Sequence, residues 1–493
     1  MHSRTRWVVL GILSSALLLI VIDMTVLYTA LPRLTHDLHA SASEKLWIVN
    51  AYALAVAGLL PGMGALGDRF GAKKLFASGL VVFGGASLLA AFSPNPEVLI
   101  AARIILAVGA AMMMPATLSI IRQIFEEPNE RALAIGVWAA VASGGAAFGP
   151  VVGGVLLEYY WWGSVFLINV PIVVVAFVFT LVLIPRSTSN PDRLFDLWAS
   201  VQILIGLVGV TYAVKEISKP SPSVEAVLVV GTLGVLFMAL FVRRQRRSPT
   251  PMIDFNLFRN HGFTAAVMTA LVASAALIGL EFAISQRFQL ALGLSPLQAG
   301  LLIVPIPLAA FIAGPLAGIV IPKLGSVRLL WASLAVAGFG VFGYLAGLQA
   351  GLYAQIASFV MIGVGLGAAM TAASTSIMHS APAHSAGVAA SIEEVSYELG
   401  GAIGIAILGS LMTAVYSGAF DPPAGVAVAE LAHDSLDAAL VAAERLSGDT
   451  AAMLIQAAER AFHSAFLTVL VVAAALLLTT SAGIALSERR RNS

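Results

Sequence analysis

Residues 170–184 read VPIVVVAFVFTLVLI, a run with almost no polar side chain. Strands of transmembrane β-barrels alternate between lipid-facing and lumen-facing residues, so an uninterrupted apolar run excludes that class. Comparable runs recur through all 493 residues, of which 59% are hydrophobic and only 11% charged. At roughly 20 to 25 residues per span plus loops, the sequence predicts an all-α membrane protein with about 12 to 14 transmembrane helices.

Apolar runs and their breaks place fourteen spans along the chain. They lie at residues 8–30, 46–66, 75–93, 98–121, 132–157, 162–184, 196–214, 224–242, 262–288, 297–321, 327–348, 351–379, 386–416 and 461–486. The first run follows Arg4 and Arg6 but is about 23 residues long, so we expect a retained span rather than a cleaved signal peptide. If the N-terminus is inside, the cytoplasmic segments carry 19 basic residues and the outer segments 7. This bias predicts that both termini are cytoplasmic.

Several classes of chemistry have no support in the sequence. The chain has no cysteine, which excludes disulfides and thiolate metal sites, and a formal net charge of +1 gives no indication of nucleic acid as a partner. His379 and His384 have no further ligands at metal spacing. No P-loop is present, so the sequence predicts no ATP motor in this chain, and any uphill transport must draw on an ion gradient or on a partner. We expect no cofactor.

A motif repeats at an offset of 254 residues. Residues 64–74 read GALGDRFGAKK, and residues 318–328 read GIVIPKLGSVR, each directly after a predicted span. Parallel repeats of this kind predict a path between two related bundles. We therefore expect a six-helix bundle at residues 1–186, two inserted helices at 187–261, and a second six-helix bundle at 262–493. The acidic segment 417–459 is predicted to be a solvated connector, with an amphipathic helix on the outer face as the alternative.

The first copy of the repeat resembles the cytoplasmic signature of the major facilitator superfamily. Its matching positions are Gly64, Gly67, Asp68, Arg69, Gly71 and Lys73. Glycines permit a tight turn and close helix approach, while Asp68 can accept hydrogen bonds from a helix N-terminus or pair with a base. The resemblance implies the major facilitator fold, with residues 68 and 69 acting as a conformational latch.

Span five carries a second signature, similar to the one that distinguishes antiporters within this superfamily. It comprises Gly145, Gly149, Pro150, Gly153 and Gly154. Small residues allow close packing, and proline removes a backbone hydrogen bond and bends the helix. We expect these residues at the interface between the bundles.

Further motifs resemble the fourteen-span drug:proton antiporters, with the methyl viologen and quaternary ammonium exporters of Gram-negative bacteria as the nearest group. The run D-x-T-x4-ALP begins at Asp23, and FLINVP begins at Phe166. Span four matches only in part, because Leu106 and Ala107 stand where the family usually has glutamine and glycine. The resemblance covers essentially the whole chain and implies export of lipophilic organic cations in exchange for protons across a bacterial inner membrane, by a monomer.

Acidic residues inside the predicted spans outnumber bases five to one. The acids are Asp23, Glu281, Glu393, Glu394 and Glu398, and the base is Arg103. An ionised side chain at the bilayer centre costs about 2.5 to 3.5 kcal/mol on insertion scales, so such acids should bind a proton or meet a cation. At about 1.5 Å per residue, Asp23 and Arg103 lie at one depth, which predicts a pair. We interpret Asp23 as the proton-coupling acid and Arg103 as its modulator, and a purely structural ion pair is the alternative.

The remaining acids divide by position. Glu394 and Glu398 are four residues apart, so they share a helix face at mid-depth and suit recognition of substrate charge. Glu393 points about 100° away and is interpreted as a polar packing residue. Glu281 lies near the outer surface and is a candidate substrate-binding acid, with simple solvation as the alternative. Aromatic side chains that could hold quaternary ammonium groups by cation–π contact are Tyr28, Tyr52, Trp138 and Tyr397. For each one singly, interfacial anchoring or packing is the better interpretation.

Three other functions stay open at this point. In the same architecture, the chain could export neutral or anionic compounds, with Arg103 and cytoplasmic bases as binding groups. A channel or a non-transporting membrane sensor is the rival of another class. A membrane enzyme has the least support, because no nucleophile, base and orienting group occur at recognisable spacing.

Overall fold

The protein was analysed as a computed structural model, which describes residues 3–40, 42–185, 196–217, 223–248, 251, 253–382, 385–421, 431–433, 435–446 and 448–492. Within these ranges the regular structure is entirely helical. Thirteen segments are long and apolar enough to cross a membrane. A further 32-residue helix, Pro128–Tyr159, corresponds to predicted span five. The prediction of an all-α membrane protein with about fourteen long helices is confirmed.

The helices fall into three sets in chain order. The N-terminal set contains α1 (Ser3–Asp37), α2 (Ala42–Phe70), α3 (Ala72–Ala91), α4 (Pro96–Ile124), α5 (Pro128–Tyr159), α6 (Ser164–Leu167) and α7 (Asn169–Leu183). A hairpin of α8 (Leu197–Ile217) and α9 (Val224–Arg247) follows, and then the short 3-10 helix η1 (Phe255–Arg259). The C-terminal set contains α10 (His261–Gln286), η2 (Arg287–Ala291), α11 (Pro296–Ile303), α12 (Pro305–Leu324), α13 (Ser326–Ala346), α14 (Leu352–Ser380), α15 (Ala386–Gly404), η4 (Ile405–Gly409), α16 (Ser410–Ala419), η5 (Leu431–His433), α17 (Leu436–Ala443) and α18 (Asp449–Asn492).

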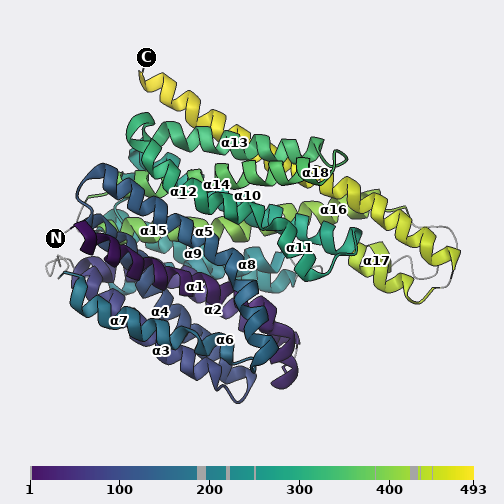
Figure 1. Ribbon diagram of the computed structural model, residues 1–493, viewed down its shortest axis with the longest axis horizontal. Helices are drawn as coiled ribbons and strands as arrows, with labels where there is room; N and C mark the ends of the chain where they lie inside the picture. Colours follow the sequence, from purple (N-terminus) through teal and green to yellow (C-terminus); the bar gives the residue numbers. More distant parts are fainter. Residues whose placement is uncertain are drawn as a thin grey trace.

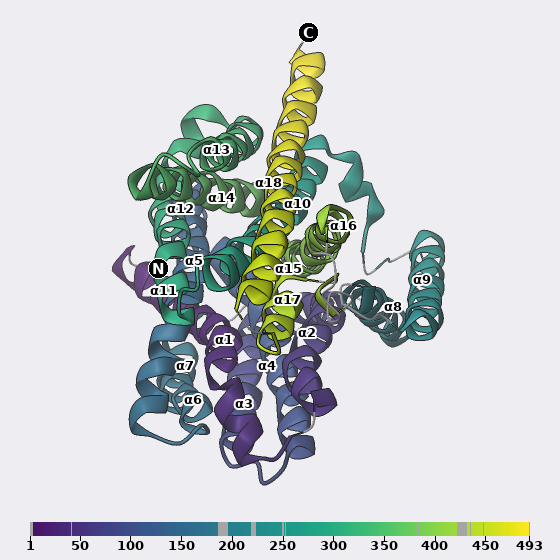
Figure 2. The same ribbon diagram turned by 90° about the vertical axis from the view of Figure 1, so that its right-hand side faces the viewer.

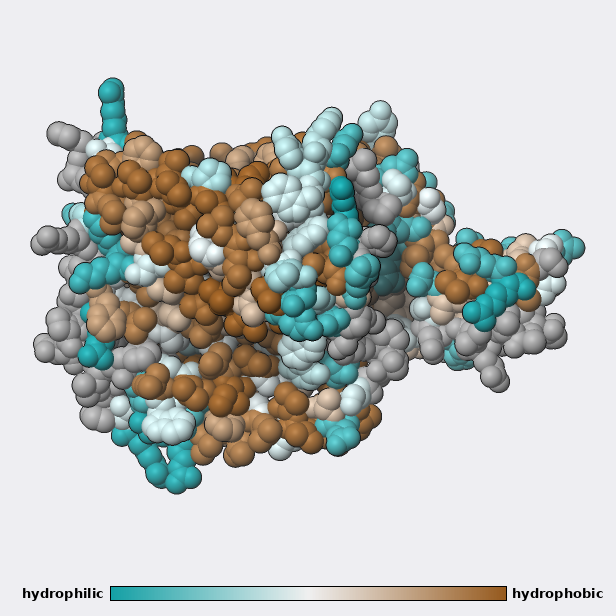
Figure 3. All heavy atoms as spheres, turned by 90° about the horizontal axis from the view of Figure 1, so that it is seen from below, coloured by the Kyte–Doolittle hydropathy of each residue, from teal (hydrophilic) through white to brown (hydrophobic). Residues whose placement is uncertain are grey.

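The long helices run roughly parallel to one another, with both chain ends at the same end of the bundle (Figure 1). We call this end the termini face and the opposite end, which carries α17, the loop face. Apolar side chains cover the middle of the visible surface, and polar ones gather toward its ends (Figure 3). Such a band is what a bilayer requires of the protein surface that contacts its hydrocarbon core.

The repeated motif has the same backbone conformation in both copies. Gly71 begins α3 with φ 97° and ψ 132°, and Gly325 begins α13 with φ 85° and ψ 148°. A positive φ strains any residue with a Cβ, so both turns require glycine. Equal turns at an offset of 254 residues support the relation between the two sets that the motif predicts.

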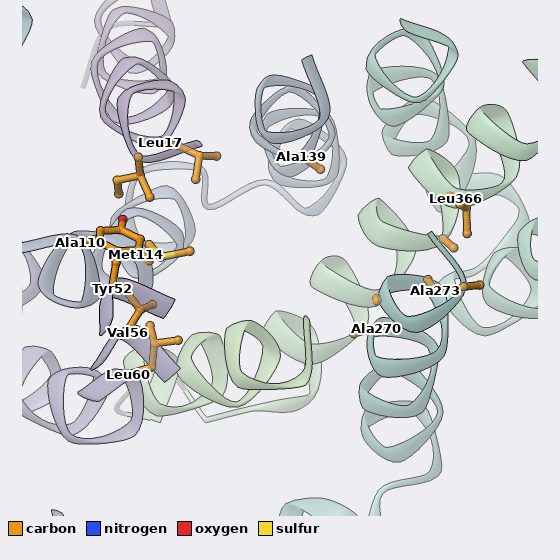
Figure 4. Packing of buried hydrophobic residues seen from close by; sticks show 14 of the residues in the cluster. Leu17, Tyr52, Val56, Leu60, Ala110, Met114, Ala139, Ala270, Ala273 and Leu366 are labelled. Carbon is orange, nitrogen blue, oxygen red and sulfur yellow. The ribbon is translucent and has the colours of Figure 1, made fainter. Parts of the chain in front are cut away.

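The N-terminal and C-terminal sets meet along a few helices. α5 packs on α12 and α14, and α15 packs on α2 and α4. Seen from the loop face, α15 lies between the two sets, while α8 and α9 lie to one side (Figure 2). The core of the N-terminal set includes one face of α2, where Tyr52, Val56 and Leu60 follow at intervals of four residues beside Ala110 and Met114 of α4 (Figure 4).

The segment 417–459 is not a simple solvated connector, so that prediction is wrong for most of its described residues. Tyr416 donates a hydrogen bond to the carbonyl of Ala432 (3.0 Å), and α17 buries Leu436 and Ala439 against its neighbours. α18 begins already at Asp449 and continues for 44 residues. At about 1.5 Å per residue it is about twice as long as a bilayer core of about 30 Å is thick. Its first turns therefore project beyond the other helices at the loop face (Figure 1).

Candidate functional site

A buried ion pair lies in the N-terminal set. Nη1 of Arg103 in α4 donates to Oδ2 of Asp23 in α1 at 2.6 Å, and both side chains are almost completely buried. The pair predicted from equal depth is therefore present. Two opposite charges in a medium of low polarity are stable there only as a pair, because each would bear a large desolvation cost alone.

Asn169 holds the other oxygen of the carboxylate. This residue begins α7, is fully buried, and donates to Oδ1 of Asp23 at 3.2 Å and to Oγ of Ser87 at 3.3 Å. Asn169 belongs to the FLINVP run, but no pattern in the sequence connects it with Asp23, which lies 146 residues earlier. A polar residue inside an apolar span was the available signal.

Tyr52 covers the guanidinium of Arg103. The Arg103 Cζ atom lies 4.3 Å from the ring centroid, and Nε donates to the carbonyl of Ile48 at 3.3 Å, one turn before Tyr52 in α2. The sequence-based prediction assigned this ring to a substrate cation, whereas in the structure it faces a cation of the protein itself. Its hydroxyl is buried without a described hydrogen-bond partner.

The acidic residues of α15 lie where the two sets meet. Glu393 accepts hydrogen bonds from Ser374 of α14 and from the hydroxyl of Tyr397 (3.2 Å), which agrees with a polar packing role. Glu394 is 5% exposed, and its Oε1 atom has no described hydrogen-bond partner. Glu398 is partly buried and lies one turn further along α15. Glu394 and Glu398 thus belong to the helix that packs between the two sets, and the hydroxyl of Tyr397 donates its hydrogen bond to Glu393.

Other predicted site residues are placed as follows. Glu281 of α10 is partly buried and makes no hydrogen bond or ion pair with any described residue. Trp138 of α5 is 2% exposed and donates to Oγ1 of Thr117 in α4 at 3.0 Å, which is the packing alternative. Tyr28 is part of α1, but its side chain lies outside the described side chains.

Asp68 connects the two sets at the termini face. Its carboxylate accepts the backbone N–H of Gly387 at 2.8 Å and of Val388 at 3.2 Å, both in the first turn of α15. An acidic side chain at a helix N-terminus satisfies free N–H groups and the positive end of the helix dipole. Gly64 lies one turn before Asp68, where a Cβ would collide with the carbonyl of Gly387. The predicted acceptance of hydrogen bonds from a helix N-terminus is confirmed.

The other residues of this motif stay within their own set. Nζ of Lys73 donates to the carbonyl of Leu181 at 2.9 Å, near the end of α7, and Arg69 lies 5.2 Å over the ring of Phe70. Gly67 faces Leu75 of α3.

A second contact at this face involves Arg122, at the end of α4. Its guanidinium donates to the carbonyl of Ala381 at 2.6 Å and to that of Pro382 at 3.4 Å, directly after α14. Cations at a helix C-terminus are favoured by unpaired carbonyls and by the dipole. We call these two contacts, made by Asp68 and Arg122, the termini-face latch.

Two glycines of the span-five signature, Gly145 and Gly149, face α1 and not the other set, so the predicted place at the bundle interface is corrected for these two. Gly145 packs against Leu18 and Val21 of α1, and Gly149 packs against Thr25 of the same helix. Gly153 and Pro150 are helical positions of α5, the side chain of Pro150 lies outside the described side chains, and a Cβ on Gly154 would meet nothing within 4 Å. The spacing of the signature predicts a face of small residues, but it does not predict which neighbouring helix packs against that face.

The close approach between α5 and α12 comes instead from a glycine outside the signature. A Cβ on Gly136 would lie 2.5 Å from the carbonyl oxygen of Gly314. A Cβ on Gly318 would likewise lie 2.5 Å from the carbonyl of Ala132, one turn nearer the termini face. The two sets are therefore in backbone contact in the half of the bundle next to the latch.

A second arginine besides Arg103 lies inside a span. Arg287 is next to the end of the predicted span 262–288, and α10 continues through a π-helical segment to Ala291, so this residue is inside the candidate span. Its Nη1 donates to the hydroxyl of Tyr344 at 2.8 Å, and its Cζ lies 5.3 Å from the ring of Phe466. The Arg287 guanidinium thus contacts two aromatic residues of the C-terminal set, whereas the Asp23–Arg103 pair lies in the N-terminal set.

Curated proteins with related sequences cover nearly the entire chain. The methyl viologen resistance protein SmvA of Salmonella typhimurium is 38% identical over 97% of this chain and 97% of its own length. The multidrug efflux pump LfrA of Mycolicibacterium smegmatis is 40% identical over 98% of this chain and 96% of its own.

Solved structures agree on the fold. A human organic anion transporter superposes with a TM-score of 0.61 at 14% identity over 97% of this chain and 100% of its own. A proton:xylose symporter gives 0.63 at 12% identity, over 98% of this chain and 95% of its own. The family model described as Major Facilitator Superfamily matches residues 13–405. The chain therefore belongs to the major facilitator superfamily and is a membrane transporter, not an enzyme.

Proposed function

We propose that the chain is a proton-coupled multidrug exporter of lipophilic organic cations, working as a monomer in a bacterial inner membrane. The observation that carries this proposal is the buried pair Asp23–Arg103 together with Glu394 of α15, a buried acid whose Oε1 atom has no described hydrogen-bond partner. The pair cancels its own charge, whereas Glu394 adds a buried acid to the helix that packs against the other set. A buried acid there favours cationic over anionic substrates. The names of the two relatives, a methyl viologen resistance protein and a multidrug efflux pump, agree with this class.

Both termini are proposed to be cytoplasmic. The distribution of 19 basic residues on that side against 7 on the other supports this orientation. The termini-face latch would then close the cytoplasmic side, and the structure would correspond to a stage at which substrate leaves outward. Rocking of the two sets about α15 would open the latch and admit substrate from the cytoplasm or the inner leaflet.

Protonation of Asp23 supplies the coupling in this scheme. A neutral Asp23 leaves the Arg103 guanidinium buried without its counter-charge, which is costly in a medium of low polarity. Among its described contacts, the ring of Tyr52 and the carbonyl of Ile48 would remain to stabilise it. The helices α1, α2 and α4 therefore gain by rearranging when Asp23 takes up a proton. Binding of a charged substrate near Glu394 and Glu398 would then favour one arrangement of the two helix sets. Protonation of Asp23 would favour the other.

α15 is the element that connects the three sites. Its first turn is held by Asp68, Glu394 lies two turns later, and Glu398 lies one turn beyond that. A helix moves as a rigid unit, so displacement of its N-terminus also displaces its acids. We propose Glu394 and Glu398 as the groups that recognise substrate charge, with Glu281 as a further acid on the outer side.

Transport in everted membrane vesicles tests the function. Vesicles energised to an acidic interior should accumulate ethidium, and ethidium added to a preformed pH gradient should release protons, both reported by fluorescence. Asp23→Asn should abolish both signals, because an amide cannot carry the proton. Ser15→Ala serves as the control in the same helix, since Ser15 bonds only its own backbone. Proton release by Asp23→Asn equal to that of the control would reject Asp23 as the coupling group, and uptake unaffected by an uncoupler in the unmodified protein would reject proton coupling altogether.

A further inference from the structure

The α8–α9 hairpin is attached to the rest of the protein on one side only. α8 packs on α2 and α15, whereas α9 packs extensively against α8 alone within the described chain. Large apolar side chains on α9 are exposed, among them Val224 (67%), Leu228 (63%) and Val235 (62%). In the view from the loop face, α9 is the outermost helix on its side (Figure 2). The long outer face of α9 thus has no neighbour among the residues that the structure describes.

A groove runs along this hairpin and ends at the termini face. It encloses about 560 Å³, and its lining residues are Val210, Val235, Met238, Ala239, Val242, Arg243, Arg246 and Arg247. All but one of these residues belong to α9, and most recur at intervals of three and four, so they form one stripe of that helix. The stripe is apolar over two turns and basic over the last turn. The groove therefore has an apolar part that matches an acyl chain and a basic end that matches an anionic headgroup.

The basic end of the groove has positive charge without a described counter-charge. Arg244 pairs with Asp196 at 2.6 Å, which also joins the ends of the two helices. No acidic side chain of the described residues pairs with Arg243, Arg246 or Arg247. A second hollow of about 420 Å³ continues around the end of α9, where Arg243 and Arg247 line it together with the paired residues Asp196 and Arg244. Arg243 and Arg247 therefore border both hollows, and Arg246 borders the first.

We propose that this groove binds an anionic phospholipid, whose phosphate is held by Arg243, Arg246 and Arg247 and whose acyl chain lies along Val235 and Met238. Guanidinium groups bind phosphate oxygens through paired hydrogen bonds, and basic groups at the end of a span meet the headgroups of the leaflet. A free phosphate would leave the apolar two turns of the groove uncovered. A symmetric second copy of the chain would place two such basic ends side by side, because both copies share one orientation in the membrane.

Native mass spectrometry of the detergent-purified full chain tests the site. We would titrate phosphatidylglycerol and, separately, phosphatidylcholine, and compare Arg243→Gln/Arg246→Gln/Arg247→Gln with Arg4→Gln/Arg489→Gln/Arg490→Gln. The control triple removes equal charge from exposed arginines near the two ends of the chain. Loss of each groove arginine should weaken phosphatidylglycerol binding about fivefold. Loss of all three should weaken it on the order of a hundredfold, whereas the control triple variant should bind nearly as well as the unmodified protein.

Other outcomes overturn the proposal. Equal retention of phosphatidylglycerol by both triple variants would show that the groove is not the site. Equal binding of phosphatidylcholine and phosphatidylglycerol by the unmodified protein would show a non-selective apolar surface. A lipid-free dimer that the groove variant alone disrupts would assign the face to a second copy, and binding of inorganic phosphate as tight as that of the lipid would assign it to a free anion. None of these results depends on the proposed transport activity.

Discussion

Arg103 is held from three directions, and each contact has a different physical character. Asp23 supplies opposite charge, the Ile48 carbonyl accepts from Nε, and the Tyr52 ring covers the guanidinium face. Only arginine combines a planar charge with donors on several edges, so lysine would keep the charge but not this geometry. The three contacts come from α1 and α2, which ties two neighbours of α4 to one side chain. A change in any contact should therefore alter both stability and coupling.

The stability of the pair can be measured by thermal unfolding in detergent. Removal of one partner of a buried pair leaves an uncompensated charge and costs about 3 to 5 kcal/mol. We expect Arg103→Ala and Asp23→Asn each to lower the melting temperature, and Asp23→Asn/Arg103→Gln to recover part of the loss, because no charge stays buried. A double variant as unstable as the sum of the singles would mean that the two side chains do not interact.

Asn169 gives a sharper test of how the carboxylate is positioned. Its amide donates to Asp23 and to Ser87, and a hydrogen bond to a charged group contributes about 1.5 to 3 kcal/mol. Asn169→Ala should reduce substrate-driven proton release by about tenfold or more, while ethidium binding measured by fluorescence polarisation stays near its original affinity.

Thr180→Ala is the matched control for Asn169, because Thr180 is buried in the same helix and bonds only its own backbone. An equal loss in both variants would indicate general damage to α7. Loss of ethidium binding in Asn169→Ala alone would place this residue at the substrate rather than at the proton site.

At the scale of elements, the termini-face latch depends on a helix end. Free N–H groups in the first turn of α15 are satisfied by a carboxylate from the other set, so this contact is made only when the sets are close. Gly64 and Gly387 permit that closeness, since a Cβ on either would collide with the other's backbone. The latch should therefore be sensitive both to charge at residue 68 and to side-chain volume at residue 64.

Cysteine labelling can report the opening of the latch, because the chain has no cysteine of its own. Ser391 is fully buried in α15 and faces Gly64, so Ser391→Cys is a near-isosteric reporter. Asp68→Asn weakens a charge-assisted contact, and we expect a membrane-impermeant maleimide added to everted vesicles to label the reporter about tenfold faster or more.

Glu130→Gln is the control for Asp68→Asn, because Glu130 pairs with Arg6 within the N-terminal set. Labelling that is unchanged by Asp68→Asn but accelerated by Glu130→Gln would contradict the latch assignment. Protection of the reporter in intact cells of both variants would additionally exclude global unfolding as the cause of faster labelling.

At the scale of the whole molecule, the sequence and the structure agree where the membrane dictates the answer. Continuous apolar runs such as residues 170–184 predict the spans, and depth within the membrane predicts the Asp23–Arg103 pair. Both predictions need only the position of each residue along the membrane normal, which the sequence provides directly. Facing direction depends on the neighbours of each helix, which is why Gly145 and Gly149 were assigned to the wrong partner and Asn169 was missed. The segment before predicted span fourteen was misjudged for another reason: its polarity resembles a loop, but α18 is helical from Asp449 onward.

The arrangement of charge over the whole molecule also determines which substrates the membrane potential opposes. A monovalent cation exchanged for one proton moves no net charge, whereas a dication exchanged for one proton carries net positive charge outward, at about 2.3 kcal/mol per 100 mV. Release of two protons removes that cost. Glu394 and Glu398, four residues apart on α15, could meet both charges of a short dication or supply the second proton.

Glu394→Gln and Glu398→Gln should therefore impair export of methyl viologen, a dication, several-fold more than export of ethidium, a monocation. We would measure vesicle uptake of both compounds with the membrane potential intact and again with it collapsed by valinomycin and potassium. The difference between the substrates should shrink when the potential is collapsed if the lost acid supplied a proton, and persist if it bound the second charge. Gln substitution at Glu281, on the outer side of α10, is the matched loss of an acid away from this pair. Equal fractional losses for both substrates in all three variants would remove the α15 acids from charge recognition and leave Asp23 as the acid on which transport depends.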